Sequence, residues 1–484
     1  MDWIFINNFI NIFLMNQNRL IIFFIINCFA FCQSEFNLNP IKMLINDQAI
    51  FDSSKNDSTN TKPIKLVFSQ YFTINTNLPN LENHNGIYIP KGTGSVSSIL
   101  ASYNTKFLQL SIELPISKFK KFPVSIPEKN KQFAVLNDVL LNDEELNDNS
   151  TNYINNSLAI KYNNFALGYE NISRWWGPGI HNSLILSNNS TGIPNYYFGT
   201  IGYKNLYKHL KYNFRYFVSN PMKNDLGNDF FLSAYELSLR YKNIEFGKSK
   251  HILSGGSPYI NWGLRDASVV NITKKKIIYW EQINDYYFLV NFPSSKLKLF
   301  FEIGFPSEDN NDNLIYPRHE SAYNLGLRKY GAFGSKNLLF GFEYTRLVQG
   351  SYYDIIPTRN WYDNKLYNYY SYNGRRWSAH SGSDSDDFLL FAGYSNQKLN
   401  LIYGINYERH GVTYHFPPEV KLESRVSFSY KLNNFFIYLN YENEYFEHYG
   451  FVDSNKNVWD ETFEPGSIQY TNTLLISLEY NISF

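Results

Sequence analysis

The sequence has little cysteine and almost no net charge, and both shortages narrow the possible functions. Its 484 residues include two cysteines, Cys28 and Cys32, which lie together in one apolar segment near the N-terminus. If that segment is removed as a signal peptide, the mature chain has no cysteine and therefore no disulfide framework. The formal net charge of +1 provides no basic surface, so we expect no nucleic-acid partner.

The sequence also lacks a long helical pattern and the short motifs of common enzyme classes. No His-Glu-x-x-His, Gly-x-Ser-x-Gly or Gly-x-x-x-x-Gly-Lys pattern occurs. His181 and Ser183 are a candidate base and nucleophile, and they would point the same way on a strand. A base must lie within hydrogen-bond distance of its nucleophile. Two residues along one strand, however, separate the Cα atoms by roughly 6.5 to 7 Å. We therefore predict no enzymatic activity, and an outer-membrane hydrolase ranks third among the possible functions.

Residues 1–32 are predicted to be a signal peptide. The segment from Leu20 to Cys32 is apolar, follows Arg19, and is too short to span a membrane as a stable helix. A start at Met15 would give a signal of ordinary length. A lipid-carrying Cys32 is the alternative, although the residues before it fit a lipobox poorly. Residues 33–62 are polar without a regular period, and we interpret them as a periplasmic lead-in.

Aromatic residues are abundant: 40 Tyr, 40 Phe and 8 Trp make up 18% of the chain. Tyr and Phe favour strands and gather at the two interfaces of a membrane. From Ile64 onward, apolar and polar residues alternate in about eighteen segments separated by turns of Asn, Gly, Asp and Pro. In one segment, Leu299 and Phe301 share one face while Lys298 and Glu302 share the other.

These segments predict an all-β transmembrane protein. No linker divides them into soluble domains, and in a bilayer spanning strands must close into a barrel so that every backbone polar group is paired. We predict that residues 63–484 form an antiparallel barrel of about 18 strands in the outer membrane of a Gram-negative cell. Long polar stretches are expected to be external loops or loops folded partly inward: residues 121–156, 250–275, 307–321, 349–386 and 445–467.

The last strand carries the strongest local signal for membrane insertion. Its apolar face is formed by Leu474, Ile476, Leu478, Tyr480, Ile482 and Phe484. An apolar-outward strand with a terminal Phe is typical of a segment read by the barrel-insertion machinery, and outer-membrane lipid would cover that face. A C-terminal edge strand of a soluble protein is the alternative, but its apolar face would be an aggregation hazard unless it were covered.

The most distinctive tract lies at residues 174–190, where two adjacent tryptophans precede the turn Gly177-Pro178-Gly179. Aromatic rings support the C–H face of a sugar, and amides bond its hydroxyls. We predict that this turn fixes a polysaccharide-binding site made by Arg174, Trp175, Trp176, Asn188 and Asn189. A Trp pair buried against the barrel wall, locking a loop in place, is the alternative.

A second polar tract carries Arg375, Arg376, His380, Asp384 and Asp386. Its carboxylate oxygens are the kind of ligand that Ca²⁺ prefers, but the tract lacks the glycine and distal Glu of an EF-hand. We therefore predict no metal site and no cofactor. Ion pairs between the two arginines and the two aspartates are expected instead, and they would narrow the lumen. Further candidate carbohydrate contacts, or interfacial girdle residues, are Trp262, Trp361 and Trp377.

These tracts resemble the Wzi-type capsule-assembly family of outer-membrane proteins. The resemblance rests on the Arg-Trp-Trp-Gly-Pro segment through Asn189, on the turn at residues 85–88 leading to Lys91-Gly92, and on residues 372–376 followed by His380 and Asp384. It implies an eighteen-stranded barrel that acts as a lectin for capsular or extracellular polysaccharide and supports its assembly or retention. An outer-membrane channel for small solutes or sugars is the alternative.

One feature of that family is not expected in this chain. The best-known members close the periplasmic end with a helical bundle, whereas residues 33–62 are too few and too rich in Asn and Asp to form one. Residues 131–146 are predicted to form one short helix at most.

Overall fold

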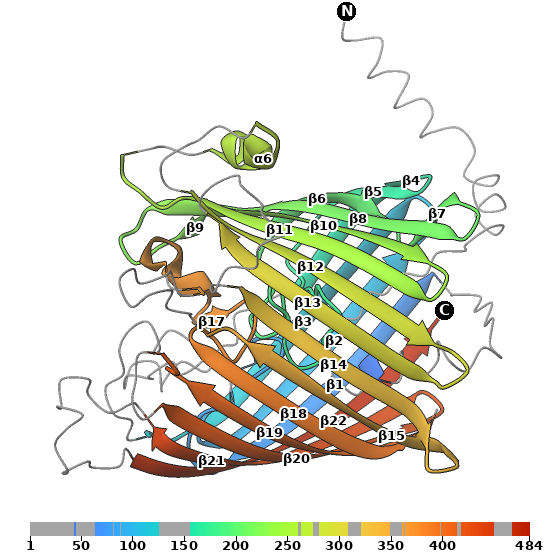
Figure 1. The fold of residues 1–484 in the computed structure, drawn as a ribbon, viewed down its shortest axis with the longest axis vertical. Coiled ribbons are helices and arrows are strands. Elements are labelled where there is room, and N and C mark those ends of the chain that lie inside the picture. The colour runs from blue at the N-terminus through green and yellow to red at the C-terminus, as the bar shows by residue number, and fades with distance from the viewer. Residues whose placement is uncertain are drawn as a thin grey trace, which may run out of the picture.

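Antiparallel strands close into an eighteen-stranded barrel in the computed structural model of this protein (Figure 1). The structure describes residues 43–44, 63–80, 82–87, 89–124, 155–259, 263–273, 280–307, 321–348, 361–362, 364–396, 398–413, 418–449 and 467–484. Within these ranges no helix is both long enough and apolar enough to cross a membrane. The predicted fold class and strand number are confirmed.

The first half of the barrel consists of β1 (Ile64–Asn75), β2 (Gly92–Asn104), β3 (Leu108–Lys121), β4 (Asn155–Tyr162), β5 (Phe165–Glu170), β6 (Asn195–Thr200), β8 (Leu210–Ser219), β10 (Asp229–Tyr241) and β11 (Ile244–Gly255). The second half consists of β12 (Trp280–Phe292), β13 (Leu297–Ser307), β14 (Ala322–Ala332), β15 (Ser335–Arg346), β18 (Ser385–Ser395), β19 (Leu399–His410), β20 (Glu419–Leu432), β21 (Phe435–Tyr449) and β22 (Ser467–Ser483). Short pieces β7 (Lys204–Tyr207) and β9 (Met222–Lys223) pair with β8 and β10.

The barrel closes where its first and last strands pair. Lys65 of β1 lies opposite Ser483 of β22, and the antiparallel register runs without a shift to Asn75 opposite Thr473. Closure leaves no free sheet edge, so every strand has a partner on both sides.

The two rims of the barrel differ in the length of their connections. The rim that carries the start of β1 and the end of β22 has tight turns, several with a residue at positive φ such as Asn163 and Asn433. Asn tolerates this conformation, which two-residue hairpins require. The opposite rim carries the long connections, among them all five predicted polar stretches. We call these the short-turn rim and the long-loop rim.

One predicted loop is shorter than expected. Strand β11 extends to Gly255 because it pairs with β12 as far as Ser254 opposite Trp280. The connection also contains helix α6 (Leu264–Thr273), which sequence periodicity did not predict. This helix packs on the barrel wall through Ala267, which contacts a cluster formed by Val218, Phe231 and Ile252.

The strands present apolar side chains outward and polar side chains inward. In β13 the predicted alternation holds: Phe301 is exposed while Lys298 and Glu302 are buried. In β22, Leu478 is exposed and its neighbours Ser477 and Glu479 are buried, so the apolar face predicted for this strand points outward. Charged side chains are rare on the outer face; Lys248 lies there with its Nζ 4.9 Å from the ring centre of Tyr286.

The predicted signal peptide and the short helix predicted at residues 131–146 lie outside the described residues. Of the predicted lead-in, the structure describes Met43 and Leu44. Leu44 is buried inside the barrel, in a cluster with Tyr71, Phe391 and Tyr438. Part of the lead-in therefore enters the lumen.

Candidate functional site: an interlocked plug and the chamber beside it

Three connections of the long-loop rim fold into the lumen and pack together. We call their described residues in 82–87, 171–194 and 361–384 the plug; in Figure 1 its strand β17 (Arg375–Arg376) lies within the ring of barrel strands. Strand β16 (Ser371–Tyr372) pairs with β17, and the 3₁₀ helix η1 (Lys365–Tyr370) precedes them. The three segments contain two of the places on which the family resemblance rests and residues 85–87 of the third.

Asn189 joins all three plug segments. Its Oδ1 accepts a hydrogen bond from the backbone N–H of Asn83 (3.1 Å), and its Nδ2 donates to the carbonyl oxygen of Arg376 (3.1 Å). The backbone N–H of Asn85 donates to the carbonyl oxygen of Asn188 (2.9 Å). Both asparagines are buried, so they hold the plug together and present no surface to a polysaccharide in this structure.

The barrel wall anchors the plug through a glutamate. The Glu343 carboxylate on β15 accepts hydrogen bonds from the backbone N–H groups of Ile180 (2.8 Å), His181 (3.2 Å) and Asn182 (2.8 Å). A carboxylate that accepts several backbone N–H groups makes charge-assisted bonds, which are stronger than neutral ones. The chain at residues 180–182 is therefore fixed to the wall.

The glycines of the predicted turn permit this close approach to the wall. Gly177 has a φ of +117°, and a Cβ there would lie 2.9 Å from a carboxylate oxygen of Glu302. At Gly179 a Cβ would lie 2.3 Å from the carbonyl oxygen of Asn182. Between them, the carbonyl oxygen of Pro178 accepts a hydrogen bond from Arg328 of the wall. Only glycine fits at both positions.

The two adjacent tryptophans have different environments. Trp176 is 3% exposed and packs edge-on against Phe217, with ring centres 5.5 Å apart. Trp175 is half-buried, and its shielded indole N–H has no hydrogen-bond partner. The buried position of Trp176 therefore does not fit the prediction that it stacks on sugar, and fits the alternative of a Trp that locks the loop in place. For Trp175, sugar stacking stays a prediction.

Arg174 keeps part of its surface exposed and forms an ion pair with Glu170 at the end of β5. Arg215 binds the same carboxylate. Arg174 is thus anchored to the end of β5, and its predicted contact with polysaccharide stays a prediction.

The expected ion pairs of the second tract are not formed as predicted. Asp386 pairs with Arg409 of β19, with Nε to Oδ1 at 2.8 Å, and Asp384 accepts from the backbone N–H of Thr413. The fully buried Arg376 guanidinium has no hydrogen-bond partner and lies 4.9 Å from the ring centre of Tyr362. The prediction was wrong for Asp386 because the neighbouring strand β19 supplies its partner. It was wrong for Arg376 because the guanidinium lies over the Tyr362 ring instead.

Two further tryptophans singled out from the sequence, Trp361 and Trp377, are each 1% exposed and belong to the plug's apolar core. They are therefore neither surface contacts nor girdle residues. Trp262 lies outside the described residues. Ser183 donates its hydroxyl hydrogen to the carbonyl oxygen of Trp176, whereas His181 faces Asp387. The two residues considered for hydrolysis are thus directed at different partners.

A buried histidine pair lies where the plug meets the wall. The rings of His181 and His380 have centres 4.4 Å apart. Burial, together with the charge of His380, lowers the pKa of His181 to about 4. Burial would also lower the pKa of His380, but the carboxylates of Glu82, Glu408 and Asp387 outweigh burial and raise it to about 9.

Carboxylates of the wall strands continue this cluster. Lys421 lies within 3.4 Å of Glu408, Glu423 and Glu444, and it also pairs with Glu82 of the plug. Sequence analysis missed these lumen-facing residues, because a single charge on the polar face of an alternating strand looks like any solvated position. The available signal was the repeated appearance of glutamate on that face in β19, β20 and β21.

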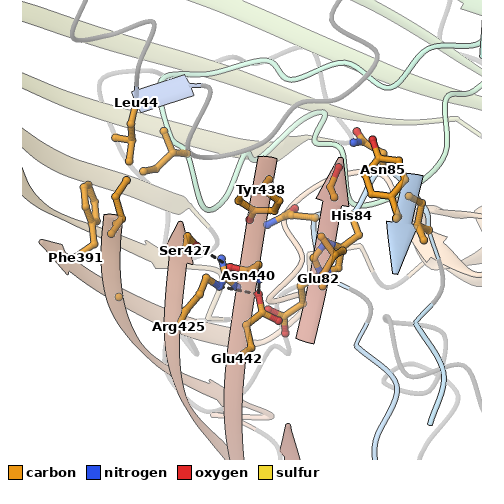
Figure 2. Close-up of a pocket in the computed structure, with 18 of the residues that line it drawn as sticks. Leu44, Glu82, His84, Asn85, Phe391, Arg425, Ser427, Tyr438, Asn440 and Glu442 are labelled. Carbon is orange, nitrogen blue, oxygen red and sulfur yellow. Dashed lines mark hydrogen bonds and ion pairs between the residues drawn. The ribbon is translucent and has the colours of Figure 1, made fainter. Parts of the chain in front are cut away.

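A chamber lies beside the plug. Figure 2 shows plug residues Glu82, His84 and Asn85 on one side and wall residues such as Arg425 and Tyr438 opposite. Aromatic rings line part of it: Tyr71, Phe391, Phe436 and Tyr438. Arg425, which lines the chamber, is already paired with carboxylates, since it lies 2.7 Å from Glu423 and 2.8 Å from Glu442.

The closed barrel defines this protein as a β-barrel of the outer-membrane type. No protein family and no curated protein matches the chain in sequence. Among solved structures it is similar to Wzi, an outer-membrane protein involved in group 1 capsule assembly in Escherichia coli and a carbohydrate-binding β-barrel. That match has a TM-score of 0.58 and 11% identity, and covers 88% of this chain and 86% of Wzi. At this identity the likeness shows the fold alone.

Other barrels are similar at lower scores. Acinetobacter baumannii OccAB4 matches with a TM-score of 0.46 and 10% identity, covering 88% of this chain and all (100%) of that one. Pseudomonas aeruginosa OccK3 matches with a TM-score of 0.45 and 10% identity, covering 87% and 95%. Scores this low do not distinguish one function from another.

Proposed function

We propose that this protein is an outer-membrane barrel that binds capsular or extracellular polysaccharide non-covalently and supports its retention or assembly at the cell surface. Lipid would cover the apolar outer face, and the long-loop rim would face outward. The observation that carries the proposal is the plug: the three segments that resemble the Wzi-type family, far apart in the sequence, interlock in the lumen. The carbohydrate-binding role of E. coli Wzi, whose fold is similar, supports the same function here.

Trp175 is the residue of the tract that we propose to contact sugar. Its ring is half-buried at the start of the plug segment, and its indole N–H has no partner within the protein. The exposed part of an aromatic ring held in this way can stack on the C–H face of a sugar. Arg174 precedes it with part of its surface exposed, and a guanidinium there suits an acidic sugar.

The test is a binding assay with the purified chain in detergent and polysaccharide extracted from the same bacterium. We expect Trp175→Ala to weaken binding about tenfold or more, because burial of a large apolar side chain contributes about 1.5 to 3 kcal/mol. Trp175→Phe keeps a stacking ring and should lose less. Tyr259→Ala is the control, since Tyr259 is 84% exposed outside the plug. Equal binding by the wild-type chain and Trp175→Ala would remove Trp175 from the site.

A channel for small solutes is the second candidate, and the observation that favours it is the chamber beside the plug. The interlocked plug favours the binding role, because three connections of the long-loop rim are bonded together inside the barrel. Conductance in planar bilayers separates the two functions. A steady open current from the wild-type protein would favour transport, and a closed barrel that binds polysaccharide would favour the lectin.

A further inference from the structure

Two histidines of the plug and two carboxylates of the wall converge on one point in the lumen. His181 and His380 come from different plug segments, Asp387 lies on β18 and Glu408 on β19. One nitrogen or oxygen from each residue lies within 4.8 Å of the corresponding atoms of the other three. All four side chains are buried.

Three of the six separations among these atoms are close to those between ligands of a tetrahedral metal ion, and the other three lie within 4.8 Å. Nε2 of His181 lies 3.2 Å from Oδ2 of Asp387, and Nε2 of His380 lies 3.5 Å from the same oxygen and 3.4 Å from Oε1 of Glu408. Metal–ligand bonds of about 2.0 to 2.2 Å in a tetrahedron place neighbouring ligand atoms about 3.3 to 3.6 Å apart. The atoms therefore need little movement to surround an ion.

Carboxylates outnumber cations around the four residues. The ion-paired network that contains them joins seven carboxylates to Lys421, Arg425 and the imidazoles of His380 and His410; the carboxylates are those of Glu82, Asp387, Glu408, Glu419, Glu423, Glu442 and Glu444. An uncompensated charge is costly in a buried site. A divalent cation among these carboxylates would offset much of the excess.

Asn406 gives an independent indication of an ion. Its buried Nδ2 contacts three atoms: Oδ1 of Asp387 (3.1 Å), Oε1 of Glu408 (3.0 Å) and Nε2 of His181. An amide nitrogen has only two hydrogens, so it cannot donate to all three. Its Oδ1 is shielded and has no hydrogen-bond partner. An ion that takes Nε2 of His181 as a ligand removes the surplus acceptor.

Residues around the four side chains suit an outer shell. Nδ2 of Asn182 donates to Oδ2 of Asp387 (2.6 Å), and the side-chain amide of Asn83 contacts Nδ1 of His380 (3.2 Å). Hydrogen bonds of this kind orient metal ligands and fix the histidine tautomer, and the choice between amide oxygen and nitrogen follows from the network.

We infer that His181, His380, Asp387 and Glu408 bind a divalent transition-metal ion, with zinc the expected ion, which fastens two plug segments to the barrel wall. Two imidazole nitrogens with two carboxylate oxygens suit zinc, whereas calcium and magnesium prefer oxygen ligands alone. The prediction of no metal site considered the second polar tract alone, whereas His181 and Glu408 come from other parts of the chain. The inference is independent of polysaccharide binding.

The test measures zinc bound to the full chain, purified in detergent with a tag that lacks histidine. After incubation with zinc chloride and removal of free ions, we expect about one zinc per wild-type chain by mass spectrometry of the metal, bound by the cluster of His181, His380, Asp387 and Glu408. The double variant His181→Ala/His380→Ala and the near-isosteric Asp387→Asn should each lose affinity by about 100-fold or more, since even outer-shell changes cost about 10- to 100-fold. His209→Ala removes an exposed histidine and should bind zinc as the wild type does.

Folding of each variant is checked by the heat-dependent gel migration of closed barrels, and Asp387→Asn carries the test if the double variant does not fold. Cobalt substituted in the wild-type chain should give the strong visible absorption of a tetrahedral site. The inference is overturned if the folded wild-type chain retains no zinc, or if Asp387→Asn retains as much as the wild type. A proton shared between His380 and the carboxylates would then account for the cluster.

Discussion

Replacing Glu343 by alanine should release the plug from the barrel wall. The Glu343 carboxylate accepts three backbone hydrogen bonds from residues 180–182, at 2.8, 3.2 and 2.8 Å. Hydrogen bonds to a charged group contribute about 1.5 kcal/mol each at the lower end, so their loss costs about 4 kcal/mol. That cost raises the population of the displaced plug by about 10³-fold relative to the wild type.

The assay is single-channel recording in planar bilayers, where a displaced plug appears as an opening. We expect openings to become far more frequent in Glu343→Ala and to increase less in Glu343→Gln, which keeps one acceptor oxygen. Glu245→Ala is the matched control, because Glu245 is also a buried wall carboxylate but bonds to Tyr203, Tyr287 and Arg240 outside the plug. Folded Glu343→Ala that opens no more often than Glu245→Ala would refute the anchoring role.

Three other substitutions test the plug core and the outer face. Gly86→Ala should reduce the stability of the plug by about 1 to 3 kcal/mol, because the new Cβ would lie 2.6 Å from the backbone nitrogen of Thr191. The loss is measured as faster limited proteolysis. Gly227→Ala controls for backbone strain, since Gly227 also has a positive φ but a Cβ there would have nothing within 4 Å. Trp176→Ala should destabilise the protein by about 3 to 5 kcal/mol in a denaturant titration; an unchanged midpoint would contradict its place in the core. Leu478→Lys should make the free energy of membrane insertion less favourable by about 2 to 4 kcal/mol, and Ile468→Lys, which lies near the rim, by about 0 to 1 kcal/mol. Equal yields of folded protein from the two variants would argue against lipid on this face.

The barrel itself could be predicted from the sequence because its signal is local and repeated. Each strand alternates apolar and polar residues, and one face must be apolar wherever lipid covers it. The number of such segments then favours one closed barrel over several sandwiches. Helix α6 could not be predicted, because its contacts with the wall join residues far apart in the chain: Ala267 packs against Val218, and the carbonyl oxygen of Ser268 accepts from Tyr216.

The plug could not be predicted, because its bonds join residues far apart in the chain. Asn189 contacts Asn83, 106 residues away, and Arg376, 187 residues away. A polar loop exposed to solvent and a polar loop folded into a polar lumen have the same composition, so the sequence of residues 174–190 is compatible with either. The same reasoning applies to the two histidines, whose carboxylate partners Asp387 and Glu408 lie on wall strands.

The binding role is tested most directly in cells that lack this chain. Polysaccharide is measured in the cell-bound and shed fractions of the deletion strain, and of the same strain carrying the wild-type chain or Trp175→Ala. The proposed function predicts that polysaccharide moves from the cell-bound to the shed fraction without a change in the total amount, and that the wild-type chain restores retention. An unchanged distribution in the deletion strain would contradict it.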